Sequence, residues 1–501
     1  MISSWRMILL AFSSIALVLI GICIRNIFFH PLRHFPGPLL PRASRVFYLW
    51  YDLRGVSHWK VKEWHEKYGP VVRISPDELS YTYAEAWSAI YGFPHRDGTG
   101  NFEKDDRWWV KSIGGDDILT ADEEGHRRMR RLQSAAFSDR ALRLQGPVIE
   151  KYTSLLIHRL HGLASTDLPY SATVDINLWY NFTTFDLIGD LAFGEPFHCL
   201  RDMKWHWWLT AVFELFRVGT FIRAARRFPT PIFYAILLLI VPKRLLKMRE
   251  DQYKFGLARV NKRMQQETDR PDFMSYILKI EDENAMTLQE TYTAAQVFIA
   301  AGSETTASGL TNATYLLLEN PHTFQKLKDE IRNSFSEEKF ITISSTAHLR
   351  YLNAVIDETL RLAPPGPGAF PRKVPKGGRV VCGAFVPGGI AVGIHHLSIG
   401  RSPLHFYQPE SFVPERWLGE AGIGFENDKK TATQAFSFGP RNCIGKNLAL
   451  MEMRIIMCRL VWNFDMELHP DSRGWLSRQK MFTTWHKTDM KVRLKARKNM
   501  P

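Results

Sequence analysis

Residues 436–445 read FSFGPRNCIG and place one cysteine, Cys443, in a glycine-bounded loop just ahead of a helix-like run. Gly439 permits a tight backbone turn, and Gly445 lets the chain approach a flat object closely. The positive N-terminal end of the following helix would favour a thiolate at Cys443, and Arg441 supplies a cation for a carboxylate. These features together suit a haem whose iron is ligated by sulfur and whose propionate is held by an arginine.

The same stretch resembles the haem-binding signature FxxGxRxCxG of the cytochrome P-450 monooxygenases at every fixed position. The resemblance implies haem b with its iron ligated axially by Cys443, and cofactor contacts from Arg441 and Phe436. It also implies a mainly α fold with a small β-rich lobe, and oxidation of an apolar small molecule by dioxygen. For the loop taken alone, a structural cysteine in a turn is the alternative.

Composition narrows the range of partners. The 501-residue chain has a net charge of +14, and its five cysteines show no paired close spacing that would support a zinc site or a disulfide framework. Basic residues are scattered and no nucleic-acid motif is present. We therefore expect no nucleic acid partner. An anionic membrane surface or an acidic protein is the expected counterpart of the positive charge.

An apolar N-terminal segment predicts a membrane anchor. Residues 7–24 are uncharged and just long enough to span a bilayer. We predict an anchor at 1–29 with one transmembrane helix, a proline-rich hinge at 30–41 without regular helix or sheet, and one haem-thiolate monooxygenase domain at 42–501. Arginines after the apolar run place that domain in the cytosol. Microsomal members of the resembled family share this arrangement, which implies a single-pass protein of the endoplasmic reticulum membrane.

Within the body, residues 71–74 and 78–81 are expected to pair as short strands, and helical spacing dominates from about residue 121. A second apolar run at 232–241 is too short to span a membrane. It is either a buried core helix or an element on the membrane surface. In the resembled family this region would be a mobile lid over the substrate entrance.

Residues 301–306 read AGSETT inside a helical pattern expected from 288 to 318. Glycine followed by serine and two threonines is unfavourable inside a helix, as is expected where function overrides stability. The segment matches the family pattern [AG]Gx[DE]T[TS]. The match implies that Glu304 and Thr305 are catalytic residues relaying protons. It also implies that Ala301 and Gly302 leave room for dioxygen. For the segment alone, a polar helix face in water is the alternative.

Charged residues elsewhere resemble a structural network of the family. Glu358 and Arg361 form an ExxR pair on a predicted helix, and Arg416 lies in the downstream FVPERW stretch. The family joins these three side chains into a buried network, to which we assign a role in folding and haem retention. An exposed pair of this kind would contribute almost nothing to stability.

Two more stretches are expected to contact the cofactor. Residues 125–131, GHRRMRR, resemble the family's WRxxR helix with His126 in place of tryptophan, which implies propionate contacts from His126 and Arg130. Arg372 follows a proline-rich turn, where the family often places a basic residue that binds a propionate. The remaining arginines of 125–131 are interpreted as a solvated basic face that could serve an acidic redox partner.

The resemblance covers essentially the whole chain, with the motifs in family order. It implies a membrane-anchored haem-thiolate monooxygenase that receives electrons from an NADPH-dependent diflavin reductase. The chain looks most like members from filamentous fungi that act on terpenoid or polyketide secondary metabolites. Two alternatives remain open: a reductase-independent haem-thiolate isomerase or dehydratase, and a non-catalytic haem-binding sensor.

Overall fold

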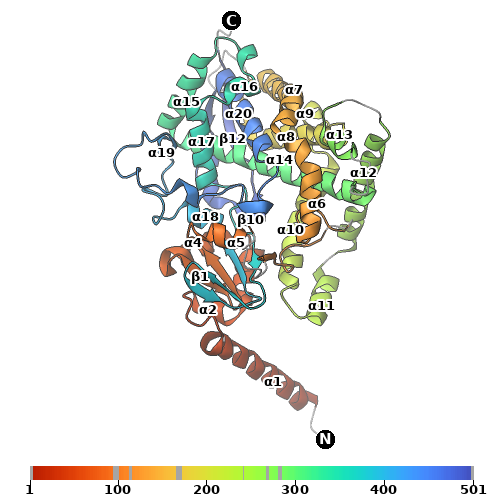
Figure 1. Cartoon of the computed structure of the whole chain (residues 1–501), viewed down its shortest axis with the longest axis vertical. Coiled ribbons are helices and arrows are strands. Elements are labelled where there is room, and N and C mark those ends of the chain that lie inside the picture. The colour runs from red at the N-terminus through yellow and green to blue at the C-terminus, as the bar shows by residue number, and fades with distance from the viewer. Residues whose placement is uncertain are drawn as a thin grey trace. The chain divides into compact units, whose positions relative to one another are not determined.

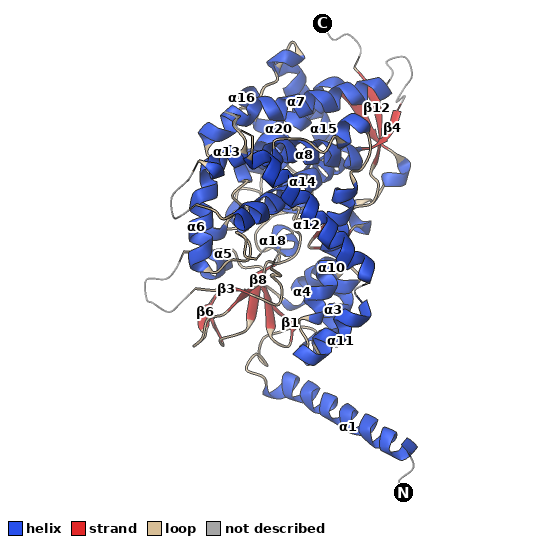
Figure 2. Cartoon of the chain, turned by 90° about the vertical axis from the view of Figure 1, so that its right-hand side faces the viewer, coloured by secondary structure: helices blue, strands red, loops and turns tan. Residues whose placement is uncertain are grey.

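The computed structural model describes residues 4–93, 101–111, 115–164, 172–240, 242–266, 270–279 and 285–497. The chain forms two compact units. Unit 1 comprises Met1–Asp105, Gly368–Ser402 and Thr431–Arg441, and unit 2 comprises Asp106–Pro367, Pro403–Lys430 and Asn442–Pro501. The elements are mainly helical with small sheets (Figures 1 and 2), which confirms the predicted mainly α fold with a small β-rich part.

Unit 1 contains most of the β structure. Its helices are α1 (Ser4–Ile24), the π-helical turn η1 (Arg25–Phe29), α2 (Leu39–Ala43), α3 (Arg45–Leu53), α4 (Ser57–Tyr68), α5 (Ala86–Tyr91), α18 (His396–Gly400) and the 3-10 turn η5 (Gly439–Arg441). Its strands are β1 (Val71–Ser75), β2 (Glu78–Tyr81), β3 (Glu103–Lys104), β5 (Arg372–Lys373), β6 (Arg379–Val381), β7 (Ala384–Val386) and β8 (Ala391–Ile394).

The main sheet of unit 1 has the strand order β1-β2-β8-β5-β3. Strands β1 and β2 pair antiparallel with Val71 opposite Tyr81, which confirms the predicted pairing of these segments. The β-branched side chains of β1 suit a pleated, half-buried surface. Val72 and Ile74 pack on Val61 and Trp64 of α4 in a small hydrophobic core. This core fixes the sheet on which Arg372 lies.

The N-terminal helix α1 projects from the rest of unit 1 in Figures 1 and 2. Residues 9–29 form the one helical stretch of the described chain that is long and apolar enough to cross a membrane, and most of its side chains are exposed. Exposed apolar side chains over such a length are typical of a lipid-facing helix. The helix matches the predicted anchor in position.

The junction after the anchor packs tightly within unit 1. Buried Arg73 on β1 donates through Nη1 to the carbonyl oxygens of Asn26 (3.0 Å) and Leu32 (3.5 Å), and through Nη2 to that of Pro76 (2.7 Å). The side chain of Asn26 in turn donates to the carbonyl oxygen of Ala43 at 2.9 Å. Backbone carbonyls therefore surround this arginine where the anchor meets the sheet.

The prediction that residues 30–41 contain no regular helix is wrong at the end of that segment. Helix α2 begins at Leu39 and includes Pro41. Proline is tolerated in the first turn of a helix because the N–H it lacks has no partner there in any case. A hinge role for the rest of the segment stays a prediction.

Unit 2 is a helical assembly with two small sheets. Its helices are α6 (Glu123–Ser134), η2 (Ala135–Phe137), α7 (Asp139–Leu163), α8 (Ile176–Phe193), α9 (Cys199–Asp202), α10 (Trp207–Ala225), α11 (Thr230–Ile240), α12 (Lys243–Met264), α13 (Phe273–Leu278), α14 (Leu288–Glu319), α15 (Pro321–Ser334), η3 (Glu338–Phe340), α16 (Ile343–Thr346), α17 (Arg350–Leu362), α19 (Glu415–Leu418), α20 (Lys446–Asn463), η6 (Pro470–Ser472) and η7 (Leu476–Arg478). Its strands are β4 (Ala172–Asp175), β9 (Phe464–Leu468), β10 (Lys480–Phe482), β11 (Thr484–His486) and β12 (Lys491–Ala496), and the short turn η4 (Lys430–Ala432) crosses the unit boundary.

Helix α14 is the longest element and contacts α8, α12, α17 and α20 (Figure 1). Its start is fixed by a capping box in which Thr287 and Glu290 satisfy each other's backbone N–H groups. It ends at Glu319, just before Pro321, which is the first residue of α15. The observed bounds agree with the predicted helix over 288–318.

The second apolar run, predicted at 232–241, forms α11, while Val241 lies outside the described residues. Ile232 is 48% exposed and Tyr234 is 59% exposed. These two exposed side chains do not support a helix buried in the core. Contact with a membrane stays a prediction.

Candidate functional site

The cysteine loop leads directly into α20, with Gly445 as the residue before its first turn. The thiol of Cys443 is exposed. Surrounding protein raises its pKa, while the Gly445 N–H, Arg130 and Lys446 act in the opposite direction. A Cβ added at Gly445 would have its nearest neighbour 3.9 Å away, on the ring of Phe137. The loop therefore presents an exposed cysteine just before a helix N-terminus, next to a glycine whose missing side chain leaves Phe137 at contact distance.

Arg130 on α6 binds the residue that precedes the cysteine. Its guanidinium donates to the backbone carbonyl oxygen of Asn442 at 2.6 Å and to the Asn442 side-chain oxygen at 2.8 Å. Helix α6 begins at an N-cap in which Asp122 accepts from the N–H of Gly125. His126, one residue further on, is buried. In this arrangement Arg130 fixes the cysteine loop to α6, a role that the sequence analysis missed.

Unit 1 holds the other three predicted cofactor contacts. Arg372 is buried, and its guanidinium lies 5.5 Å from the centre of the Tyr91 ring. Burial lowers the pKa of Arg372 to about 10. Tyr91 acts against this shift, and repulsion from Arg441 adds to it. The Nε of Arg372 has no hydrogen-bond partner in the part of the chain that the structure describes. Phe436, like Arg441, is half-buried.

Gly439 opens the turn at the start of η5 and is required there for two reasons. Its φ of +75° is a conformation that other residues rarely adopt. A Cβ at this position would lie 2.0 Å from the carbonyl oxygen of Tyr91, which is closer than any real contact. The tight turn predicted at this glycine is confirmed, and its cause is the backbone of α5.

The structure places the predicted site residues in two groups, one in each unit. Arg372, Arg441 and Phe436 belong to unit 1. The group in unit 2 consists of Cys443, Arg130, His126, Glu304 and Thr305.

Glu304 and Thr305 lie in the middle of α14. Glu304 is buried, Thr305 is half-buried and Ala301 is exposed, so this helix face is only partly covered by protein. The hydroxyl of Thr305 donates to the carbonyl oxygen of Ala301 at 2.5 Å. A Cβ at Gly302 would lie 2.8 Å from Ile188. The missing side chain of Gly302 therefore also makes room for Ile188 of α8, and its role in leaving room for dioxygen stays a prediction.

A lysine far along the chain completes the surroundings of Glu304. The Nζ of Lys487 lies 3.0 Å from the Oε1 of Glu304, and both side chains are 3% exposed. The hydroxyl of Ser308 donates to the same oxygen at 3.3 Å. Burial raises the pKa of Glu304 and lowers that of Lys487, with their mutual attraction acting against both shifts. No sequence motif indicated this contact.

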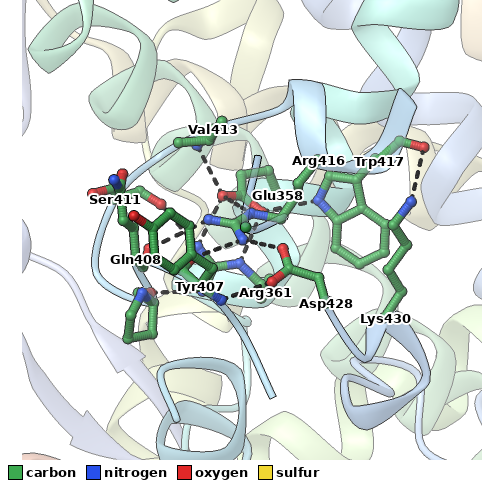
Figure 3. Close-up of polar contacts among 12 residues, drawn as sticks. Glu358, Arg361, Tyr407, Gln408, Ser411, Val413, Arg416, Trp417, Asp428 and Lys430 are labelled. Atoms are coloured by element: carbon green, nitrogen blue, oxygen red, sulfur yellow. Dashed lines mark hydrogen bonds and ion pairs between the residues drawn. The ribbon is translucent and has the colours of Figure 1, made fainter. Parts of the chain in front are cut away.

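The predicted network of Glu358, Arg361 and Arg416 is confirmed (Figure 3). The Glu358 carboxylate lies 2.8 Å from Arg361 Nε and 3.0 Å from Arg416 Nε, and all three side chains are fully buried. Asp428 pairs with the remaining side of Arg416, and the indole N–H of Trp417 donates to Glu358 at 2.9 Å. Two carboxylates thus face two arginines, so the buried charges balance.

Comparison with known proteins decides the family. The sequence profile described as Cytochrome P450 matches residues 36–493. The chain belongs to the cytochrome P450 family. Membership implies a haem-thiolate cofactor, a substrate, dioxygen and a redox partner, and it identifies the chain as a P450 monooxygenase.

Curated relatives match almost the full length. The chain is 44% identical over 474 residues to "Cytochrome P450 monooxygenase aclL" of Aspergillus oryzae, covering 94% of this chain and 95% of the relative. It is 41% identical to "Cytochrome P450 monooxygenase astA" of Talaromyces wortmannii, covering 98% of each. It is 40% identical to "Trichothecene C-15 hydroxylase" of Fusarium sporotrichioides, covering 98% of this chain and 99% of the relative.

Proposed function

We propose that this P450 uses Cys443 as the axial thiolate of haem b and oxidises an apolar small molecule in fungal secondary-metabolite biosynthesis. The position of Cys443 carries the proposal. Cys443 is exposed, it stands just before the N-terminus of α20, and a Cβ at Gly445 would be in ordinary contact with the Phe137 ring at 3.9 Å. Burial raises the pKa of the Cys443 thiol, whereas the Gly445 N–H at the helix N-terminus and Arg130 act against that shift and favour the anionic sulfur, as thiolate ligation requires.

The proposed cofactor contacts fit the chemistry of haem. Arg372 is a buried cation whose Nε has no hydrogen-bond partner among the described residues, and a second arginine, Arg441, repels it. An anionic propionate would relieve both the repulsion and the unmet donor. Phe436 and His126 would add ring contacts, and Arg130 would hold the loop through Asn442. When bound, thiolate-ligated haem supplies electron transfer to dioxygen and its activation.

Proton supply falls to α14 in this proposal. The Thr305 hydroxyl can both donate and accept a hydrogen bond, and it lies on the partly uncovered face of the helix. Glu304, the adjacent acid, is buried beside Lys487. An acid next to an exchangeable hydroxyl can pass protons inward one at a time. We assign these two residues to the proton relay.

Several observations support the proposed substrate class and cellular location. The named relatives include monooxygenases from filamentous fungi and a hydroxylase of a trichothecene. The apolar helix over residues 9–29 supports a membrane anchor. We propose that the membrane is that of the endoplasmic reticulum and that the haem domain at 42–501 faces the cytosol. An NADPH-dependent diflavin reductase in the same membrane would supply electrons. We propose a terpenoid or polyketide substrate.

Carbon monoxide binding tests the ligand assignment. The reduced protein with carbon monoxide should show the red-shifted Soret band of thiolate-ligated haem, and Cys443→Ala and Cys443→His should both abolish it. Cys382→Ala is the matched control and should keep the band. Retention of the band in Cys443→Ala would overturn the proposal. The substrate is identified by comparing extracts of strains with and without the protein.

A further inference from the structure

We propose that Lys487 is a positioning residue that shares one proton with Glu304 and thereby supplies the acid of the relay. The inference rests on the proposed function, because it assigns a purpose to the acid beside Thr305. It adds a residue from the C-terminal β10–β11 hairpin, whose strands pair antiparallel just ahead of Lys487.

The contact between Lys487 and Glu304 is short and buried, and it involves only one of the two carboxyl oxygens. The Lys487 Nζ and Glu304 Oε1 are 3.0 Å apart, and each side chain is 3% exposed. The second carboxyl oxygen of Glu304, Oε2, has no partner in the described residues. The nearby hydroxyl of Ser308 reaches only Oε1. One oxygen of the acid thus remains available to another partner.

Burial acts on both members of the pair. It disfavours both charges, raising the pKa of Glu304 and lowering that of Lys487. At 3.0 Å the two groups offer one proton two sites, the Lys487 nitrogen and the Glu304 oxygen, and groups in such contact titrate as a unit. Asp175, at the end of β4, is a second carboxylate that acts on Lys487 and favours its charged form.

The proposed step moves one proton and no electrons. An N–H bond of the Lys487 ammonium breaks, an O–H bond forms on Glu304, and the two charges become two neutral groups. Glu304 then gives its proton inward through Thr305 and is left as the carboxylate. Lys487 regains a proton from water, which restores the ion pair.

A purely stabilising role fits the contact poorly. A buried ion pair is weak evidence for stability, since desolvation of the charges offsets their attraction. An unpartnered carboxyl oxygen in the interior adds a further cost. A buried pair that contributes little to stability is expected where function requires it.

Infrared spectroscopy of the holoprotein tests whether Lys487 sets the charge of Glu304. Subtracting the spectrum of the matching Glu304→Gln variant isolates the protonated-carboxyl band of Glu304. At neutral pH this band should be larger in Lys487→Met than in the wild type, and Lys480→Met, an exposed lysine on the same hairpin, should leave it unchanged. Equal bands in the wild type and Lys487→Met would overturn the proposal.

Coupling of NADPH oxidation to product separates this inference from the relay itself. Lys487→Met should lower the yield of product per NADPH about tenfold or more, with hydrogen peroxide in its place. The same change in a Glu304→Gln background should have no further effect, and Lys487→Arg should restore part of the yield. If Thr305→Ala loses coupling while Lys487→Met keeps it, the role of Lys487 is wrong and the relay stands. If both variants keep full coupling, the relay itself is wrong.

Folding failure does not block the test. Should Lys487→Met not accumulate, the Glu304→Gln/Lys487→Met double variant carries no unpaired buried charge and is expected to fold. Lys487→Arg then provides the comparison with the wild type in both experiments. An unchanged Glu304 band and unchanged coupling in Lys487→Arg, together with failure of Lys487→Met to fold, would identify a structural pair and contradict the proposal.

Discussion

Arg130 holds Asn442, the residue before Cys443, by two hydrogen bonds from one guanidinium, at 2.6 Å to the backbone carbonyl oxygen and 2.8 Å to the side-chain oxygen. A planar guanidinium fits such paired acceptors, whereas a lysine can satisfy only one of them well. These two bonds therefore restrain the cysteine loop against helix α6. The orientation of the Cys443 sulfur depends on a residue 313 positions earlier in the chain, since Cys443 follows Asn442, which lies 312 positions from Arg130.

Arg130→Ala should loosen the cysteine loop. We expect a loss of about 1–2 kcal/mol in the free energy of unfolding and a lower haem content per protein. Arg130→Lys should recover part of both. Haem absorbance per mole of protein and urea unfolding measure the two effects. Arg131→Ala, an exposed neighbour on α6, is the control. If Arg130→Ala keeps full haem content and stability, the two bonds do not restrain the loop.

Glu358→Gln should disable the buried network. The change removes the carboxylate between two fully buried arginines, a kind of loss that costs about 3–5 kcal/mol. Holoprotein yield, read from the carbon monoxide difference spectrum, should fall sharply. Glu420→Gln breaks an exposed pair with Arg350 and should change stability by less than about 0.5 kcal/mol. Similar yields from these two variants would contradict the structural role of the network.

Thr305→Ala should uncouple the enzyme with little effect on haem content. Product formation should fall about a hundredfold, NADPH consumption much less, and hydrogen peroxide should account for the difference. Thr311→Ala is the control. It removes the same type of hydrogen bond six residues further along α14, where the Thr311 hydroxyl donates to the carbonyl oxygen of Ala307 at 2.7 Å. That variant should stay coupled. Full coupling in Thr305→Ala would mean that another group supplies the proton.

Two deletions of the anchor should differ in stability. Removing residues 1–24 should release the protein from membranes and keep the carbonyl of Asn26, which accepts from buried Arg73 at 3.0 Å. Removing residues 1–29 also deletes that acceptor and should lower the free energy of unfolding by about 2 kcal/mol more. Membrane fractionation and urea unfolding give the two readouts. Equal stability of both proteins would show that Asn26 contributes nothing to the junction.

Glu452 should make stability fall as pH rises. It is a buried carboxyl on α20 whose two oxygens lack partners in the described residues, and burial raises its pKa well above the usual value. The unfolded chain therefore loses this proton first, and the folded state is penalised progressively above a pH of about 4.3. Glu452→Met should remove that part of the pH dependence and gain about 1–3 kcal/mol at pH 7. Parallel pH profiles for the wild type and the variant would contradict this assignment.

The sequence carried enough information for the parts of the molecule that depend on neighbours along the chain. The bounds of α14 agree with the Thr287–Glu290 capping box and Pro321, and β1 and β2 pair as neighbours joined by a short turn. The Glu358 network was predictable because the family resemblance named its members.

Contacts between distant side chains were not predictable in this way. Lys487 meets Glu304 only because the β10–β11 hairpin ends beside α14. Arg130 likewise contacts Asn442, 312 positions away, and one of its two acceptors there is a backbone carbonyl, which leaves no mark in residue identity. The close approach of Ile188 to Gly302 was also not predictable, because Ile188 lies on another helix.

The buried network of Figure 3 also has a consequence during protein synthesis. Glu358 bonds to Arg416, 58 residues later, and Arg416 in turn pairs with Asp428. A nascent chain that stops short of these residues cannot complete the charge balance around α17, and that helix cannot be buried at low cost. Incomplete chains are therefore expected to stay open and sensitive to proteases. The buried charges of the network are expected to be balanced only in chains that extend beyond Asp428.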